Sequence, residues 1–104
     1  MSNLLWTAAK MKQPILVKLL LEMGERDKLT IYWAARSGCE KSLRMCLDAG
    51  LKYDNAVYTA ACYGHENCLR MCLDAGMRDK DAIFIAKHNK HKNCIKILKK
   101  YGCV

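Results

Sequence analysis

The chain has 104 residues, 52% of them hydrophobic and 8% aromatic, and a formal net charge of +8 at pH 7. A chain of this length fits one domain with a buried core. Its apolar run over residues 15–21 is interrupted by Lys18 and falls well short of the roughly 20 residues that cross a bilayer, so no membrane segment is expected. The first ten residues lack the charged, apolar and small-residue order of a signal peptide, which favours an intracellular, cytoplasmic protein.

Residues of one kind recur every 26 positions along the chain. Glycine recurs at Gly24, Gly50, Gly76 and Gly102, and alanine at Ala8, Ala34, Ala60 and Ala86. An aromatic residue stands two positions before each of these alanines: Trp6, Tyr32, Tyr58 and Phe84. A spacing that stays in phase through the whole chain is typical of a repeat protein. We therefore expect one domain, residues 1–104, built from four units over residues 1–26, 27–52, 53–78 and 79–104.

Each unit is predicted to fold as two short helices joined by a tight turn. In the first unit, Pro14 falls in the first turn of the second helix, where a missing N–H has no cost. In the next two units, Gly38 and Gly64 supply the turn, because glycine adopts backbone conformations that other residues resist. The helices of the third unit are expected over residues 56–63 and 66–75, and the glycine that ends each unit is expected to cap the second helix. Candidate N-terminal caps of the first helices are Asn3, Asp27, Asp54, Asn55, Asp79 and Asp81.

Helices of about eight to ten residues are marginal in water by themselves, so neighbouring units must bury one another's apolar faces. The small alanines of the pattern allow the first helices to approach closely. Larger apolar residues are expected to form the core of the second-helix layer: Val17, Leu43, Leu69 and Ile95. The predicted fold class is all-α, a right-stacked helical repeat solenoid of four helix–turn–helix units.

Residues 59–76, TAACYGHENCLRMCLDAG, resemble the helical part of an ankyrin repeat. The double alanine, the Gly64-His65 turn, the apolar second helix and the final glycine occur in the order of that family. The second unit matches with Cys39 in place of the histidine, and the fourth unit has Lys90 in place of the turn glycine. An ankyrin unit normally has about 33 residues, and the residues missing here are those of its projecting β-hairpin, so a full hairpin is not expected. The shortened unit is similar to ankyrin-like arrays of amoebal large DNA viruses and protists.

Ankyrin repeats typically bind other proteins through their hairpin tips and first helices, so the resemblance implies a non-catalytic protein–protein interaction scaffold. Without full hairpins, recognition falls to the ends of the first helices and to the connectors. The residues that follow the alanines differ from unit to unit. A binding surface would show this variation, and neutral sequence drift on a solvent-exposed face would show it too. The predicted partner-binding residues are Lys10, Met11, Arg36, Ser37, Cys62, Tyr63, His88 and Asn89. Tyr63 and Arg36 rank first, because Tyr and Arg are enriched among interface hot spots.

His65, Cys68 and Cys72 share one face of a predicted helix, a spacing that suggests a zinc site. Zinc usually takes four ligands, however, and the repeat explains the three residues as a turn histidine and two core thiols, so no metal and no cofactor are predicted. The seven cysteines are interpreted as free thiols in a reducing compartment. The sequence has no separate nucleophile–base pair, paired carboxylates or glycine-rich phosphate loop, so neither an enzyme nor a small-molecule substrate is expected.

The last unit is the most basic part of the chain, and its lysines are Lys80, Lys87, Lys90, Lys92, Lys96, Lys99 and Lys100. A terminal unit needs a polar outer face, and Lys99 and Lys100 near a helix C-terminus favourably oppose the helix dipole. Alternatively, the lysines bind nucleic acid or an acidic partner, and the chain is then a basic helical-repeat protein that acts through its C-terminal unit.

Overall fold

The computed structural model describes residues 4–103, and this part of the chain has eight helices and no strand. The helices are α1 (Leu4–Lys10), α2 (Pro14–Glu22), α3 (Leu29–Ser37), α4 (Glu40–Asp48), α5 (Asn55–Tyr63), α6 (Glu66–Asp74), α7 (Ala82–His88) and α8 (Lys92–Lys100). The predicted all-α class is confirmed, and Pro14 is the first residue of α2 as expected. Within residues 4–103, no helix is long and apolar enough to cross a membrane.

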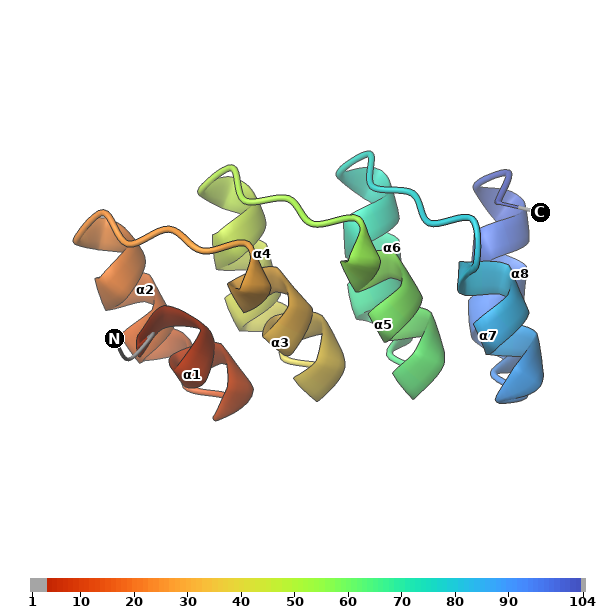
Figure 1. Ribbon diagram of the computed structural model, residues 1–104, viewed down its shortest axis with the longest axis horizontal. Helices are drawn as coiled ribbons and strands as arrows, with labels where there is room; N and C mark the ends of the chain where they lie inside the picture. The colour runs from red at the N-terminus through yellow and green to blue at the C-terminus, as the bar shows by residue number, and fades with distance from the viewer. Residues whose placement is uncertain (1–3, 104) are drawn as a thin grey trace.

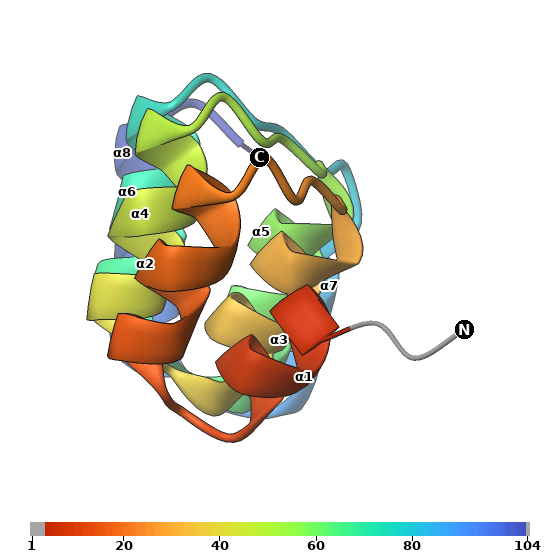
Figure 2. The same ribbon diagram turned by 90° about the vertical axis from the view of Figure 1, so that its left-hand side faces the viewer.

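The helices form two rows, seen end-on in Figure 2. In the first-helix row, α1, α3, α5 and α7 lie side by side in chain order, and in the second-helix row α2, α4, α6 and α8 do the same (Figure 1). Each first helix also packs against the second helix of its own unit. The molecule measures 39 × 21 × 21 Å along its principal axes, so the units follow one another along the long axis.

The core lies between the two rows and between neighbouring units. Of the four residues predicted for the second-helix layer, Val17, Leu43 and Leu69 are fully buried. Ile95 is only partly buried, because it belongs to the unit at the outer end of the row. In the second unit, Thr30 is fully buried and its hydroxyl has no hydrogen-bond partner among the described residues. The alanines that recur every 26 residues are all buried: Ala8, Ala34, Ala60 and Ala86.

The turn glycines allow a histidine of the next unit to pack against them. The ring of His65 lies against Gly38, where an added Cβ would be 2.7 Å from Nδ1, and His91 lies in the same way against Gly64. The Nε2–H of His65 donates a hydrogen bond to the carbonyl oxygen of Arg36 at 2.9 Å, and His91 makes the equivalent bond at 3.0 Å. Each of these histidines therefore links two units.

The turn between the two helices has a left-handed residue in all four units. Gly38 and Gly64 have φ of 73° and 74°, and the equivalent Lys12 and Lys90 have φ of 56° and 61°. A residue with a side chain lowers the stability of the fold by about 1–2 kcal/mol when it adopts this conformation. Lysine is sterically possible at position 12 because Cys39, rather than a histidine, stands at the matching position of the next unit.

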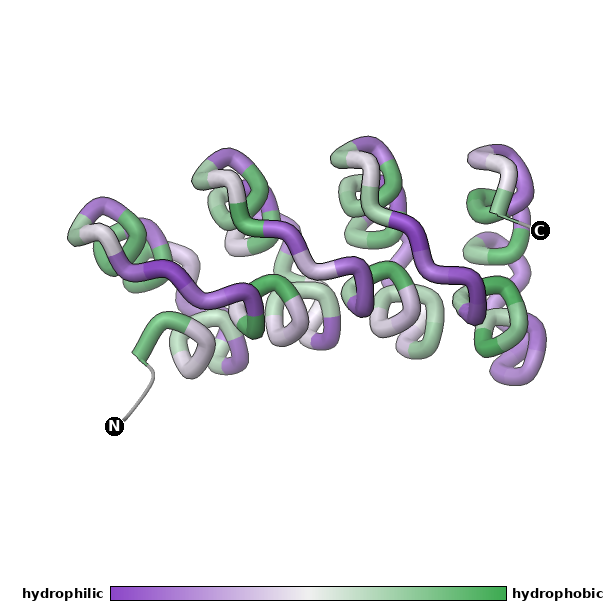
Figure 3. The backbone as a smooth tube through the Cα atoms, turned by 45° about the horizontal axis from the view of Figure 1, so that its top comes forward, coloured by the Kyte–Doolittle hydropathy of each residue, from purple (hydrophilic) through white to green (hydrophobic). Residues whose placement is uncertain are grey.

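The connectors between units are short and mostly hydrophilic (Figure 3), although Met77 in the third connector is buried and Leu51 in the second packs against the core. Residues 49–54 join α4 to α5 without a strand, so the expectation that no full hairpin forms is confirmed for the described residues. Gly76 (φ 89°) follows α6, and the N–H of Met77 returns to the carbonyl of Cys72 at 3.1 Å, as a glycine cap requires. The guanidinium of Arg78 bonds two further carbonyl oxygens at 2.8 and 2.9 Å, which fixes the path of the connector.

The N-cap residues of α3, α5 and α7 make no side-chain capping bond, so the predicted capping of the first helices is wrong for these three helices. Asp27, one residue before the N-cap Lys28, comes nearest to it, because it accepts a hydrogen bond at 2.9 Å from the N–H of Leu29, the first residue of α3. Asp54 precedes α5 but accepts a bond from the N–H of Arg78 at 3.4 Å, because the connectors of adjacent units run side by side. Within residues 4–103, the other candidates do not cap the first turn of a helix: Asn55, Asp79 and Asp81. Asn3 lies outside the described residues.

All seven cysteines are free thiols, and the buried ones are Cys46, Cys68, Cys72 and Cys94. Burial raises the pKa of Cys46, Cys68 and Cys72 to about 12 and that of Cys94 to about 11. These four side chains therefore pack as small apolar groups, as predicted, and stay protonated near neutral pH.

Candidate functional site

The predicted partner-binding residues lie in the last turn of the first helices or directly after it. Six of them are exposed: Lys10, Met11, Arg36, Tyr63, His88 and Asn89. Ser37 and Cys62 are partly buried. Because the four first helices lie side by side (Figure 1), these residues form a line across the first-helix row.

Arg36, in the last turn of α3, contacts two aromatic rings. Its guanidinium carbon lies 5.2 Å from the ring centroid of Trp33 and 5.1 Å from that of Tyr63 in the neighbouring α5. One N–H donates to the hydroxyl of Tyr32 at 2.9 Å, and this hydrogen bond raises the pKa of Arg36. Among residues 4–103, no carboxylate pairs with Arg36, so most of its five N–H donors remain open to a ligand.

Trp33 extends this arrangement to the first unit. Its ring stacks on that of Trp6 with centroids 5.7 Å apart and an interplanar angle of 17°, and the Nζ of Lys10 lies 4.8 Å from the Trp33 centroid. Tyr32 meets the Trp33 ring edge-on at 5.1 Å. Trp33 does not stand out in the repeat pattern, because the other units have no aromatic residue at this position. The cation–aromatic cluster, as we call it, consists of Lys10, Trp33, Arg36 and Tyr63.

The remaining predicted residues are not brought into this cluster. The hydroxyl of Ser37 lies 3.3 Å from the carbonyl oxygen of Ala34 in its own helix and 3.4 Å from that of Ala9 in α1, so its one proton is shared between them. The side-chain amide of Asn89 donates to the carbonyl of Cys62 at 2.9 Å and so joins two neighbouring units. His88 stacks on the exposed Phe84 with centroids 6.4 Å apart, at the other end of the first-helix row. Met11 is exposed in the turn that follows α1.

The first-helix row carries positive charge only. The four first helices and the turns that follow them contain no Asp or Glu, and their cationic residues are Lys10, Lys12, Arg36, Lys87 and Lys90. All ten acidic residues belong to the second helices or the connectors. The connectors meet the first helices at their N-termini, about 10–13 Å along the helix from the line of predicted residues at the C-termini. The predicted surface is therefore positive and has no acidic residue within its own helices.

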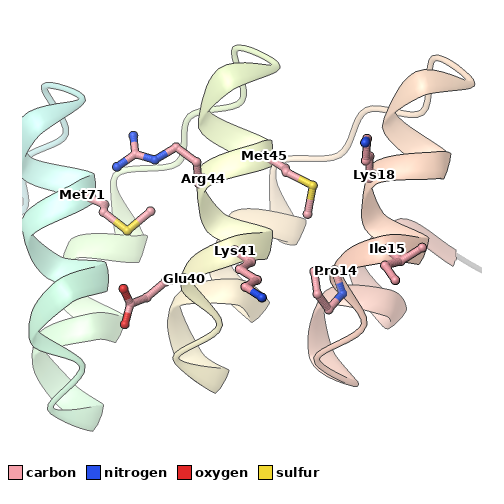
Figure 4. Close-up of a pocket in the computed structure, with 8 residues that line it drawn as sticks. All are labelled: Pro14, Ile15, Lys18, Glu40, Lys41, Arg44, Met45 and Met71. Carbon is pink, nitrogen blue, oxygen red and sulfur yellow. The ribbon is translucent and has the colours of Figure 1, made fainter.

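A groove of about 580 Å³ lies on the other face of the molecule, across α2, α4 and α6 (Figure 4). Its lining residues are Pro14, Ile15, Lys18, Glu40, Lys41, Arg44, Met45 and Met71. The groove has an apolar wall and side chains of both charge signs. It belongs to the second-helix row and does not reach the cation–aromatic cluster.

The residues considered for zinc binding have other places in the structure. His65 bonds the carbonyl of Arg36, and Cys68 and Cys72 are buried in the core. In the described part of the chain, no three His, Cys, Asp or Glu side chains are grouped so that they could hold a metal ion.

The chain matches no protein-family model, and comparison with curated proteins finds no relative. A functional conclusion therefore depends on the surface that the structure presents.

Proposed function

We propose that the four units form one ankyrin-like solenoid, which binds another protein through its first-helix row and catalyses no reaction. The observation that carries this proposal is the cation–aromatic cluster. It brings Lys10, Trp33, Arg36 and Tyr63 together from three adjacent helices. Trp, Tyr and Arg are the residue types that most often dominate the binding energy of protein interfaces.

The contrast between a regular frame and a varied surface supports the same function. His65 and His91 make equivalent bonds to the preceding unit, and Asn67 and Asn93 each donate to a glutamate of the preceding unit at 3.1 Å. Residues at equivalent exposed positions of the first helices differ from unit to unit. Stacked helical units of this kind provide an extended surface whose shape is set by the frame.

The lysines of the fourth unit support a capping role for that unit. Lys87 and Lys99 stand where the third unit has Ala61 and Leu73, which are buried. Both lysines are exposed, so the outer side of the fourth unit meets solvent with charged groups. A capping role explains these lysines without a nucleic acid partner. The main support for the alternative function is thereby weakened, and protein binding by the first-helix row is favoured.

The test begins with affinity capture from a lysate of the organism that encodes the chain, and continues with calorimetric titration of the purified captured protein. Wild-type chain should bind it saturably, and Tyr63→Ala and Arg36→Glu should each weaken binding at least about tenfold. Arg44→Glu makes the same charge change on the exposed second-helix row and should leave affinity unchanged.

A gel-shift experiment separates this function from nucleic acid binding. If the chain shifts single- or double-stranded DNA or RNA with an affinity that falls steeply with salt, and Lys99→Gln with Lys100→Gln abolishes the shift, the nucleic acid function replaces our proposal. Equal loss of protein binding in Arg36→Glu and Arg44→Glu would also contradict it.

A further inference from the structure

We propose that the cation–aromatic cluster is a carboxylate-binding site, and that the partner presents an acidic protein segment to it, with Arg36 as the principal contact and Lys10 as the second. This inference rests on the proposed function and specifies the chemistry of the partner.

Arg36 is preorganised for binding. Its guanidinium carbon lies about 5 Å from the ring centroids of both Trp33 and Tyr63, and one N–H donates to the hydroxyl of Tyr32. A guanidinium held in this way has already lost much of the side-chain freedom that binding would otherwise remove. Its remaining N–H groups form a planar fork that matches a carboxylate in a bidentate geometry.

Two cations converge on the ring of Trp33. The Nζ of Lys10 and the guanidinium carbon of Arg36 each lie about 5 Å from the centroid of the same ring, that of Trp33, so they are at most about 10 Å apart. Neighbouring acidic side chains of one peptide can reach both groups at this separation. Two cations that share one ring are also held in a constant relation to each other, which favours a specific ligand over a diffuse counterion.

The positive charge of the first-helix row is not neutralised by acidic residues of the same helices. No Asp or Glu occurs in α1, α3, α5, α7 or the turns after them, and among the described residues no carboxylate pairs with Arg36. Charge complementarity with an acidic segment would therefore steer encounter and fix register without breaking an existing ion pair.

The occupied ring faces favour a protein over a nucleic acid as the source of the anion. Nucleic acid surfaces of this composition use open aromatic faces on which bases stack. Here Trp33 is stacked on Trp6 and approached by both cations, and Tyr63 already faces Arg36. A base would have to displace these contacts, whereas a carboxylate approaches the guanidinium edge and leaves them in place.

Fluorescence anisotropy with labelled peptides of about a dozen residues tests the inference at about 0.15 M salt. The probes are a peptide of Glu and Asp spaced by Gly and Ser, its Gln and Asn counterpart, its phosphoserine counterpart, and oligo-dT of similar length. The acidic peptide should bind saturably and the amide peptide should not. Arg36→Gln should weaken binding on the order of tenfold, and Arg36→Lys should also weaken it, because an ammonium lacks the fork.

Arg44→Gln is the matched control, since it removes the same charge from the second-helix row, and it should bind the acidic peptide within about twofold of wild type. Arg44→Gln should unfold at the wild-type denaturant midpoint. Arg36→Gln should unfold cooperatively at a slightly lower midpoint, because it loses its contacts with Trp33, Tyr63 and Tyr32, and a cooperative transition shows that the frame is intact. Equal weakening by Arg36→Gln and Arg44→Gln, no binding of the acidic peptide to wild type, or tighter binding of the phosphopeptide or oligo-dT than of the acidic peptide overturns the inference.

The two proposals fail separately. If the captured protein partner binds Arg36→Gln as tightly as wild type but loses affinity for Tyr63→Ala, the carboxylate site is refuted and the protein-binding function stands. If no protein binds the first-helix row saturably, the proposed function itself is refuted.

Discussion

The packing of His65 on Gly38 predicts a large cost for a single added methyl group. In Gly38→Ala, the new Cβ would be 2.7 Å from Nδ1 and 2.8 Å from Cε1 of His65, where an ordinary contact begins near 3.4 Å. The ring must move by several tenths of an ångström, which strains or breaks its hydrogen bond to the carbonyl of Arg36. Losing that bond costs about 0.5–1.5 kcal/mol.

The backbone adds a second contribution, because φ at Gly38 is 73° and a side chain there costs about 1–2 kcal/mol. Gly38→Ala should therefore lower the free energy of unfolding by about 2–3 kcal/mol, a large part of the stability of a small domain. Urea denaturation followed by circular dichroism measures the change. Lys12→Gly is the opposite change, because it relieves the same backbone strain at φ 56°. The residue of the next unit that corresponds to His65 is Cys39, so no histidine ring is involved there. Lys12→Gly should therefore be neutral or stabilise the protein by up to about 1 kcal/mol.

A double-mutant cycle with His65→Ala separates the two contributions. In the His65→Ala background, Gly38→Ala should cost only the backbone part, about 1–2 kcal/mol. If Gly38→Ala costs the same with and without the ring, the histidine does not restrict this position. If it costs less than about 0.5 kcal/mol in wild type, the reasoning from the left-handed turn is also refuted.

Three further predictions concern the core. Leu69→Ala should lower the free energy of unfolding by about 2–5 kcal/mol and Ile95→Ala by less, because Leu69 is fully buried and Ile95 is not; equal costs in urea denaturation would contradict this ranking. Thr30→Val removes a buried hydroxyl that has no hydrogen-bond partner among the described residues. It should raise the free energy of unfolding by about 1 kcal/mol and so raise the urea midpoint. A lower midpoint would show that the hydroxyl has a hydrogen-bond partner. The four buried thiols should leave stability unaffected below about pH 8 and lower it increasingly above, because they ionise at their ordinary pKa of 9.0 when unfolded and only near 11 or 12 when folded. Each thiol should lower the free energy of unfolding by about 1 kcal/mol at pH 10. Cys68→Ser introduces the residue that the second unit has at this position, and it should make the fall in stability between pH 8 and pH 10 shallower. An unchanged dependence of stability on pH would contradict the prediction.

Features set by residues close together in the chain could be predicted from the sequence. Pro14 begins α2, and α6 over Glu66–Asp74 is one residue shorter than predicted. The helix expected over residues 56–63 begins one residue earlier, at Asn55. These boundaries follow from helical periodicity, proline and glycine, all of which act within one or two turns.

Features that depend on how neighbouring units are offset could not be predicted in the same way. Trp6 and Trp33 stand at different positions of their units, so the repeat pattern gives no reason to place them together, and the stack depends on the lateral offset of α1 and α3. Asp54 bonds the next connector rather than its own helix for the same reason. The partial exposure of Ile95 reflects its place at the end of the row, since its three equivalents are fully buried.

The third unit, residues 53–78, is complementary to itself from one side to the other. Toward the second unit it offers donors, the Nε2–H of His65 and the amide of Asn67, and toward the fourth it offers matching acceptors, the carbonyl of Cys62 and the carboxylate of Glu66. A tandem duplication of these 26 codons would place a donor edge against an acceptor edge and add one layer of about 10 Å to the rod. The molecule can therefore be lengthened in steps without designing a new junction.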